Sequence, residues 1–141
     1  MKLIICEKPS VGMAIASALG IETKNDGYME SEDFLVSWCI GHLAELSQPS
    51  CYGSEYEKWS LEALPILPKT WQLTISKDKE KQFSVLKALL FRNDVTEVIN
   101  ACDAGREGEL IFRFVMEKAG CKKPVKRLWI SSMEESAIRK G

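Results

Sequence analysis

Apolar positions along the chain fall into short continuous runs, each followed by a loop and an amphipathic stretch. Residues 2–6 (KLIIC) form the first run, and the alanine-rich residues 11–20 predict a helix that ends at Gly20. Residues 95–120 and 126–136 repeat the order of strand, loop and helix; Gly120 closes the second helix and residues 132–135 (SMEE) have the spacing of a capping box. This order, met three times, predicts a small doubly wound α/β fold, with a mostly parallel sheet flanked by helices.

The middle of the chain has a different pattern. Apolar residues alternate over residues 34–40 (FLVSWCI), which predicts a strand with one buried face, and residues 30–33 (ESED) predict the turn of a hairpin before it. Residues 48–68 are irregular but rich in proline and aromatic residues, so we expect an ordered excursion wrapped on the domain. Its aromatic side chains suit packing better than stacking on nucleic-acid bases.

Helical spacing returns at residues 77–93, where leucines and a phenylalanine share one face and lysines the other. We therefore interpret residues 1–141 as one domain with an insertion at roughly residues 22–76. The length of 141 residues, with 45% hydrophobic and 28% charged content, is sufficient for one buried core.

Composition narrows the class of protein further. No segment approaches the roughly 18 apolar residues of a membrane span, and no signal-peptide layout is present, so we expect a soluble cytoplasmic protein with no membrane partner. A net charge of −1 gives no overall positive field for nucleic acid, so any DNA contact must be local or assisted by a metal. Five scattered cysteines, without a C-x-x-C pair, and a single histidine argue against a zinc site and suggest reduced, mostly buried thiols.

Carboxylates gather at the ends of two expected strands. Glu7 follows the first strand, Asp103 follows the strand that ends near residue 102, and Glu107 lies at the start of the next helix. Sites of parallel α/β sheets form at the carboxyl ends of strands, so these acids face one crevice if the strands are adjacent, and Gly105 and Gly108 let the backbone turn tightly. Crowded carboxylates need a compensating cation, and oxygen ligands without nearby cysteine or histidine favour Mg²⁺.

Each candidate also has a structural interpretation. Glu107 and Glu109 can be ordinary charges at the start of a helix, and Glu109 is the weakest metal candidate. Lys8 and Arg106 can each neutralise a phosphate or pair with a neighbouring carboxylate. His42 fits a structural histidine better than a catalytic one.

Four motifs, in order, resemble one known family. Residues 3–20 (LIICEKPSVGMAIASALG), 40–46 (IGHLAEL), 103–113 (DAGREGELIFR) and 127–141 (RLWISSMEESAIRKG) are similar to the N-terminal Toprim domain of type IA DNA topoisomerases, specifically of the bacterial topoisomerase III group. The resemblance covers essentially the whole chain. It implies a Rossmann-like fold and a magnesium-dependent isomerase that cleaves one DNA strand through a phosphotyrosine link, passes another strand and reseals the break.

The resemblance also implies roles for single residues. The family glutamate that matches Glu7 lies beside the scissile phosphate and assists proton transfer, and the lysine that matches Lys8 steadies the phosphate. The magnesium-binding D-x-D-x-E motif maps onto Asp103, position 105 and Glu107, but position 105 is a glycine here. We therefore expect a two-acid site, supported by Glu7, that binds magnesium more weakly than the full motif does.

The nucleophilic tyrosine of the family lies in a later domain, and none of the three tyrosines of this chain matches its motif. We interpret the chain as a fragment, inactive alone, whose partners are single-stranded DNA and the remaining domains of the same enzyme. Two alternatives stay open: a stand-alone Toprim nuclease, and a non-enzymatic assembly module in which Gly105 marks a decayed metal site. A plain nucleotide-binding domain is disfavoured, because no G-x-G-x-x-G follows the first strand.

Overall fold

The computed structural model describes residues 1–141 and contains one six-stranded sheet in the order β2-β3-β4-β1-β7-β8. Four strands are parallel, and two short strands extend one edge antiparallel. The parallel strands are β1 (Lys2–Cys6), β4 (Phe34–Trp38), β7 (Glu97–Ala101) and β8 (Val125–Arg127), and the edge strands are β2 (Thr23–Asn25) and β3 (Tyr28–Glu30).

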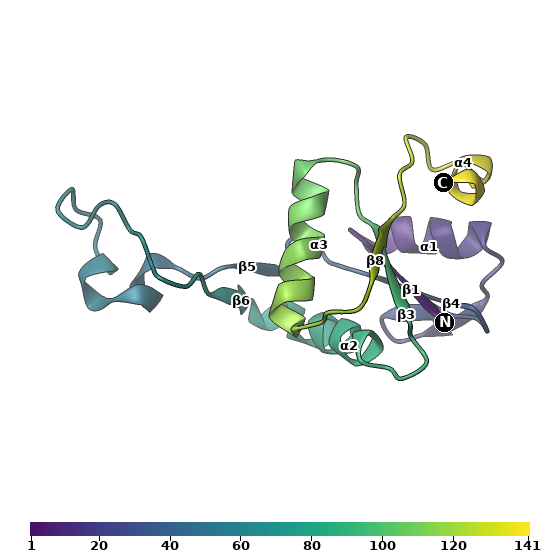
Figure 1. Ribbon diagram of the computed structural model, residues 1–141, viewed down its shortest axis with the longest axis horizontal. Helices are drawn as coiled ribbons and strands as arrows, with labels where there is room; N and C mark the ends of the chain where they lie inside the picture. Colours follow the sequence, from purple (N-terminus) through teal and green to yellow (C-terminus); the bar gives the residue numbers. More distant parts are fainter.

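Helices cover both faces of this sheet (Figure 1). One face carries α1 (Pro9–Ala18) and α4 (Glu135–Lys140), and the other carries α2 (Glu80–Leu90) and α3 (Arg106–Ala119). The expected α/β fold with three strand-loop-helix units is therefore confirmed. None of these helices has the length and apolar character needed to cross a membrane.

Each face of the sheet has its own apolar core. Leu3 and Ile5 of β1 belong to a cluster of 16 buried residues on the side of α2 and α3, whereas Ile4 belongs to a cluster of 11 on the side of α1 and α4. Strand β4 is buried on both faces as well, from Leu35 to Trp38. The prediction that this strand has one buried face is wrong, because helices cover both faces of the sheet: Leu35 packs in the cluster on the side of α2 and α3, and Val36 in the cluster on the side of α1 and α4.

Glycines end two of the helices as expected. Gly20 and Gly120 follow α1 and α3 with φ of 70° and 74°, a left-handed conformation that glycine adopts without steric cost. The capping box expected for α4 is not formed. The hydroxyl of Ser132 accepts a hydrogen bond from the backbone N–H of Glu134 at 3.2 Å, and the helix begins one residue later, at Glu135, without a side-chain cap.

Residues 22–76 divide into two parts in the structure. Strands β2, β3 and β4 belong to the main sheet, and the turn at residues 31–33 forms the expected hairpin between β3 and β4. Beyond them, β5 (Ala44–Leu46) and β6 (Leu73–Ile75) pair antiparallel as a separate two-stranded sheet. They carry residues 47–72, which we call the arm.

The arm extends away from the main sheet, at the left of Figure 1. It contains two short 3-10 helices, Pro49–Tyr52 and Ser54–Tyr56, and a third, Lys77–Lys79, leads from β6 into α2. The expectation that this segment wraps on the domain is wrong, because no residue from Glu45 to Lys81 is buried.

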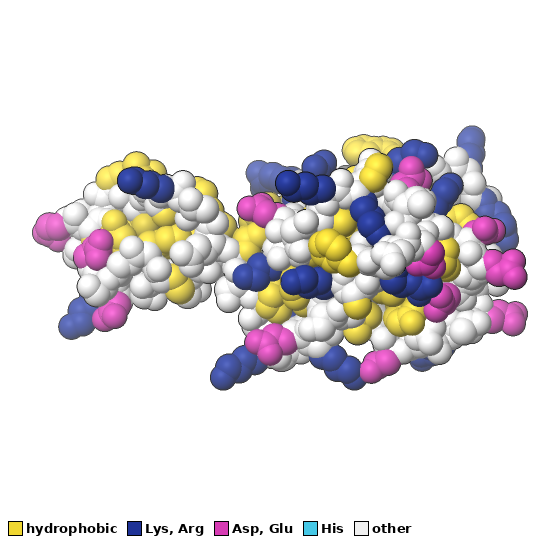
Figure 2. Space-filling model, turned by 60° about the horizontal axis from the view of Figure 1, so that its bottom comes forward, with side chains coloured by type: hydrophobic (Ala, Val, Ile, Leu, Met, Phe, Trp, Pro, Cys, Tyr) yellow, Lys and Arg dark blue, Asp and Glu magenta, His cyan; other side chains and the backbone are white.

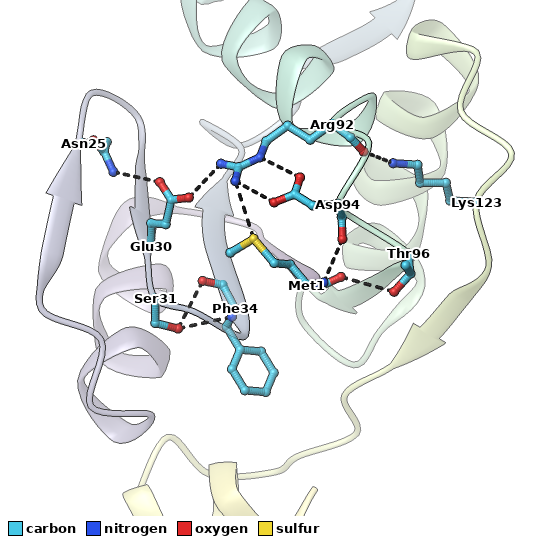
Figure 3. A network of polar contacts seen from close by, with 9 residues as sticks. All are labelled: Met1, Asn25, Glu30, Ser31, Phe34, Arg92, Asp94, Thr96 and Lys123. Carbon is cyan, nitrogen blue, oxygen red and sulfur yellow. Dashed lines mark hydrogen bonds and ion pairs between the residues drawn. The ribbon is translucent and has the colours of Figure 1, made fainter.

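A polar network closes the end of the sheet where the parallel strands begin (Figure 3). Arg92, just after α2, pairs with Glu30 of β3 and with Asp94, each at 2.8 Å. The amine of Met1 donates to the carbonyl of Asp94 at 2.7 Å, and Nζ of Lys123 donates to the carbonyl of Arg92 at 2.7 Å. The hydrogen bond from Arg92 holds the pKa of the Asp94 carboxyl below its usual value. At the opposite end, where the parallel strands finish, the loops that carry Glu7 and Asp103 begin.

Candidate functional site

Loops from three neighbouring strands meet where the parallel strands end. Cys6, the last residue of β1, is in register with Ala101 of β7 on one side and with Trp38 of β4 on the other. The strands before Glu7 and Asp103 are therefore adjacent, which is the condition that the expected crevice required. Such a junction of loops is the usual position of a site in an open α/β sheet.

Glu7 and Asp103 are in direct contact across this junction. The backbone N–H of Asp103 donates to Oε2 of Glu7 at 3.4 Å, so the glutamate carboxylate is held against the loop that begins with Asp103. Glu7 is half-buried, whereas Asp103 is exposed. One oxygen of Glu7 thus has a fixed partner, and the Asp103 side chain remains accessible to a ligand.

Lys8 and Arg106 each stand at the beginning of a helix. Lys8 is the extended residue before α1, and Arg106 is the first residue of α3; both side chains are exposed. Neither forms an ion pair in the structure, in contrast to the pairing that their structural interpretation required. Their positive charges are available to an anion at this end of the sheet.

Glu107 meets a partner that sequence reasoning did not assign to it. Its Oε1 lies 3.2 Å from Nε2 of His42, in the loop after β4. That loop is tied to the site because Gly41 donates its N–H to the carbonyl of Glu7 at 3.3 Å, and Nζ of Lys79 donates to the carbonyl of His42 at 2.7 Å. His42 therefore belongs to the same cluster of loops as the carboxylates, and its position after a predicted strand was the available signal.

The two glycines of the acidic loop have different roles from the one expected. Gly105 precedes α3 with an extended φ of −155°, and a Cβ built there would meet nothing within 4 Å. At Gly108, in contrast, a Cβ would lie 2.8 Å from the backbone nitrogen of Asp103 and closer still to its carbonyl oxygen. The expectation that both glycines allow a tight turn is therefore wrong. A larger side chain fits at Gly105, whereas the missing side chain at Gly108 lets α3 approach the backbone of Asp103.

Glu109 is engaged in a network that holds the same loop from the other side. It accepts hydrogen bonds from Nδ2 of Asn100 at 2.8 Å and from Nε of Arg113 at 2.7 Å, and it pairs with Arg127 at 3.2 Å. Arg127 in turn donates to the carbonyl of Asp103 at 2.6 Å. Glu109 is therefore a structural anchor for the loop, and not a simple charge in solvent.

Sequence reasoning missed Asn100 and Arg127. The one available signal was a polar residue, Asn100, inside the apolar run of β7, where it is 1% exposed. Its Oδ1 accepts the N–H of Cys102 at 3.1 Å, so a buried amide links the end of the strand to the Glu109 network. Buried polar side chains of this kind are retained when their hydrogen bonds are satisfied.

A pocket of about 250 Å³ opens beside Asp103, between α1 and the segment that follows β8. Its apolar wall includes Val11 and Leu128, and its polar groups include Asp103 and the hydroxyls of Ser131 and Ser132. The site therefore combines exposed charge with an adjoining hollow.

The carboxylate loop itself presents oxygen donors, which fit a hard cation such as Mg²⁺. The expectation that no histidine lies near these acids is wrong, because Nε2 of His42 lies beside Glu107. No group of three or more histidine, cysteine, aspartate or glutamate side chains is assembled for a metal. One or two carboxylates are nevertheless enough for Mg²⁺, which keeps several waters and takes further oxygens from a phosphate.

The thiols beneath the loops are held in the neutral form. Burial raises the pKa of Cys6, and a hydrogen bond to Cys39 together with burial raises the pKa of Cys102. No disulfide joins the five cysteines, and Cys6, Cys39 and Cys102 are buried, which confirms the expectation of mostly buried thiols. Neutral thiols are poor metal ligands and poor nucleophiles.

Comparison with known proteins places this arrangement in a family. A family model described as "Toprim domain" matches residues 2–133. The chain is 49% identical over 140 residues to DNA topoisomerase 3 of Shouchella clausii, and 46% identical over 139 residues to the proteins of that name from Bacillus subtilis and Staphylococcus epidermidis. Each match covers 99% of this chain but only 19% to 20% of the relative, so the chain spans about a fifth of their length.

Proposed function

Because this chain belongs to the Toprim domain family, we propose that it supplies the metal-binding and proton-transferring half of the active site of a type IA DNA topoisomerase, of the topoisomerase III group. The observation that carries this proposal is the contact between Glu7 and the backbone of Asp103 at the ends of adjacent parallel strands. It brings an acid from one loop to the start of the acidic loop after the next strand. The unpaired Lys8 and Arg106 at the same end of the sheet supply positive charge for a DNA phosphate.

Asp103 and Glu107, with Glu7, would hold Mg²⁺. When bound, the ion would stabilise negative charge on a DNA phosphate during cleavage and resealing. The contact of Glu107 with the His42 ring leaves its second carboxylate oxygen for such a ligand, since only Oε1 is engaged. Gly105 contributes no carboxylate, which supports the proposal of a two-acid site with weaker magnesium binding than a full D-x-D-x-E motif.

Glu7 would move the proton. Its Oε2 is held by the N–H of Asp103, which leaves Oε1 to accept a proton from, or return one to, the 3′ oxygen of the broken strand. Lys8, the next residue, would keep the phosphate in place as a compact positive charge. These roles restrict the chain to half of the reaction, because the nucleophilic tyrosine would come from another domain.

Single-stranded DNA segments and the remaining domains of the same enzyme are therefore the partners that we propose, and the cytoplasm is the proposed location. The relatives' names support the DNA substrate, and the 19% to 20% of their length that the chain matches supports the existence of further domains. The chain alone would not relax DNA.

The test is magnesium-dependent relaxation of a supercoiled plasmid by the protein made from the complete reading frame. Glu7→Gln should lower the rate by at least about 100-fold, because general acid–base catalysis of this kind contributes that much. Glu22→Gln is the matched control, since Glu22 is an exposed acid outside the site and should leave the rate unchanged. Equal rates for the two variants would remove Glu7 from the mechanism.

Two other outcomes would favour the alternatives. Magnesium-dependent nicking of DNA by residues 1–141 alone, lost in Glu7→Gln, would indicate a Toprim nuclease. An absence of any magnesium dependence would favour an assembly module.

For the metal site itself, Glu107→Ala should abolish detectable magnesium binding in a calorimetric titration of the complete protein, and unchanged affinity would contradict the assignment of Glu107.

A further inference from the structure

The arm presents the most exposed apolar side chains of the molecule. Leu61, Trp59 and Leu67 are 86%, 82% and 76% exposed, more than any other large hydrophobic residue. Of the 13 large hydrophobic residues that are exposed in the chain, six lie between residues 46 and 71. Figure 2 shows hydrophobic side chains gathered over the lobe that the arm forms. Contiguous apolar surface of this kind marks an interaction site in a soluble protein.

The arm is ordered and anchored although nothing covers it. Tyr52 packs edge-on against Trp71, with 6.1 Å between ring centroids, and its hydroxyl accepts the N–H of Gln72 at 2.9 Å. At the base, Nζ of Lys118 on α3 donates to the carbonyl of Leu73 at 2.5 Å. A segment held in this way presents its apolar side chains in a fixed arrangement, which reduces the entropic cost of binding.

A pocket at the base of the arm continues the apolar surface. It has a volume of about 300 Å³ and is lined by Leu46, Trp71 and Leu73 of the arm and its two strands, and by Phe114 and Glu117 of α3. An apolar side chain from a partner fits a pocket of this composition, because such anchors carry most of the binding energy of protein interfaces.

The charge of the arm indicates a protein partner and not a nucleic acid. Residues 47–72 contain three glutamates and two lysines, so the arm is slightly acidic. Surfaces that bind single-stranded DNA combine aromatic residues with a positive groove, which the arm lacks. The relatives are about five times as long as this chain, so their polypeptide supplies a large covalently linked surface.

We propose that the arm and the pocket at its base form a docking surface for an apolar patch on another domain of the same polypeptide, in the complete enzyme. This inference rests on the proposed function for the existence of those domains. The arm then fixes the position of the Glu7 and Asp103 loops relative to the domain that brings the nucleophile. The Toprim domain would thus be held through two contacts, the shared active site and the arm.

Limited digestion of the complete protein by trypsin tests the proposal through cleavage after Lys69, an exposed residue of the arm. In the double variant Trp59→Ser/Leu61→Ser we expect cleavage at least about tenfold faster than in the wild type, because loss of two anchors releases the arm. Phe91→Ser is the matched control: Phe91 is 53% exposed at the end of α2, outside the arm, and its replacement should not change the rate.

Three outcomes would overturn the docking proposal. Equal cleavage of the double variant and the wild type would show that the arm is free. Protection that requires an added single-stranded oligonucleotide would assign the arm to DNA, and protection that rises with protein concentration would assign it to a second copy. If the double variant fails to fold by circular dichroism, Leu67→Ser replaces it in the same assay. Plasmid relaxation is measured separately, so an unprotected arm with Glu7-dependent relaxation contradicts this inference alone, and a protected arm without magnesium-dependent activity contradicts the proposed function alone.

Discussion

Replacement of Gly108 by alanine tests how closely α3 must approach the acidic loop. The added Cβ would lie 2.8 Å from the backbone nitrogen of Asp103 and closer still to its carbonyl oxygen, separations that real Cβ atoms essentially never show. The neighbouring atoms are backbone, so no rotation of a side chain can relieve the overlap. Either α3 or the loop that begins at Asp103 must move.

The expected cost follows from three contributions. Alanine gains about 1 kcal/mol over glycine inside a helix. Overpacking costs about 1–3 kcal/mol, and a shift of Asp103 weakens the hydrogen bond that its carbonyl accepts from Arg127, which as a charged bond contributes about 1.5–3 kcal/mol. We expect the Gly108→Ala variant to lose about 2 kcal/mol of unfolding free energy.

Urea unfolding followed by circular dichroism measures this loss. Gly105→Ala is the matched control, because a Cβ at Gly105 meets nothing within 4 Å and its φ is extended, so the change should stay below about 1 kcal/mol. A Gly108→Ala variant as stable as the wild type, or more stable, would refute the close approach of α3 to Asp103. A calorimetric titration with Mg²⁺ on the same variant reports whether the displacement of Asp103 weakens the magnesium binding that we propose for it.

Three further predictions follow from the site and the network of Figure 3. Gly105→Asp fits the open space before α3 and adds a carboxylate, so magnesium affinity should rise by roughly tenfold in a calorimetric titration. Asp94→Asn removes a carboxyl whose pKa is lowered by the hydrogen bond from Arg92. The stabilising contribution of this carboxylate is fully present above the unfolded-state pKa of about 3.9 and is lost as pH falls through the lower folded-state pKa. In urea unfolding the variant should therefore be less stable than the wild type at about pH 5, and the difference should shrink steadily as the pH is lowered below about 3.9. Thiol labelling read by mass spectrometry should modify the exposed Cys51 first, while the buried thiols Cys6 and Cys102 react only after unfolding, because their raised pKa keeps them protonated.

The sequence predicts the strands and helices around the acidic loops because their signals are local. The runs that precede the two acidic loops are almost continuously apolar, which is typical of parallel strands buried on both faces. Glycines mark the helix ends at Gly20 and Gly120. The sequence also indicates that Glu7 and Asp103 lie near each other, because both residues closely follow such runs. Only the adjacency of the two strands has to be assumed, and the structure shows it.

Features that depend on which segments meet in space were not predictable. The Glu109 network joins Asn100, Glu109 and Arg127, and a sequence does not show that a strand, a helix and the next strand bring these residues to the carbonyl of Asp103. The close approach of Gly108 to Asp103 has the same origin, because it depends on where α3 lies relative to the loop before it.

The exposure of the arm is not predictable from the sequence for a different reason. Its proline and aromatic content predicts an ordered segment, but composition does not show whether the apolar side chains are covered by their own domain. Trp71 packs against Tyr52 inside the arm, as the expected packing role of the aromatic residues requires, whereas the Trp59 side chain is 82% exposed. Similarly, the spacing of residues 132–135 matched a capping box, yet Ser132 forms its hydrogen bond before the helix starts.

The central position of β1 has a consequence for synthesis of the chain. Residues 2–6 leave the ribosome well before β7, one of the two strands that pair with them, which spans residues 97–101. Until that strand emerges, one edge of β1 has no hydrogen-bonding partner, and unpaired edges of this kind associate with other chains. Nascent chains arrested between β4 and β7 should therefore aggregate or bind a chaperone, whereas chains long enough to release β7 complete the centre of the sheet in one step.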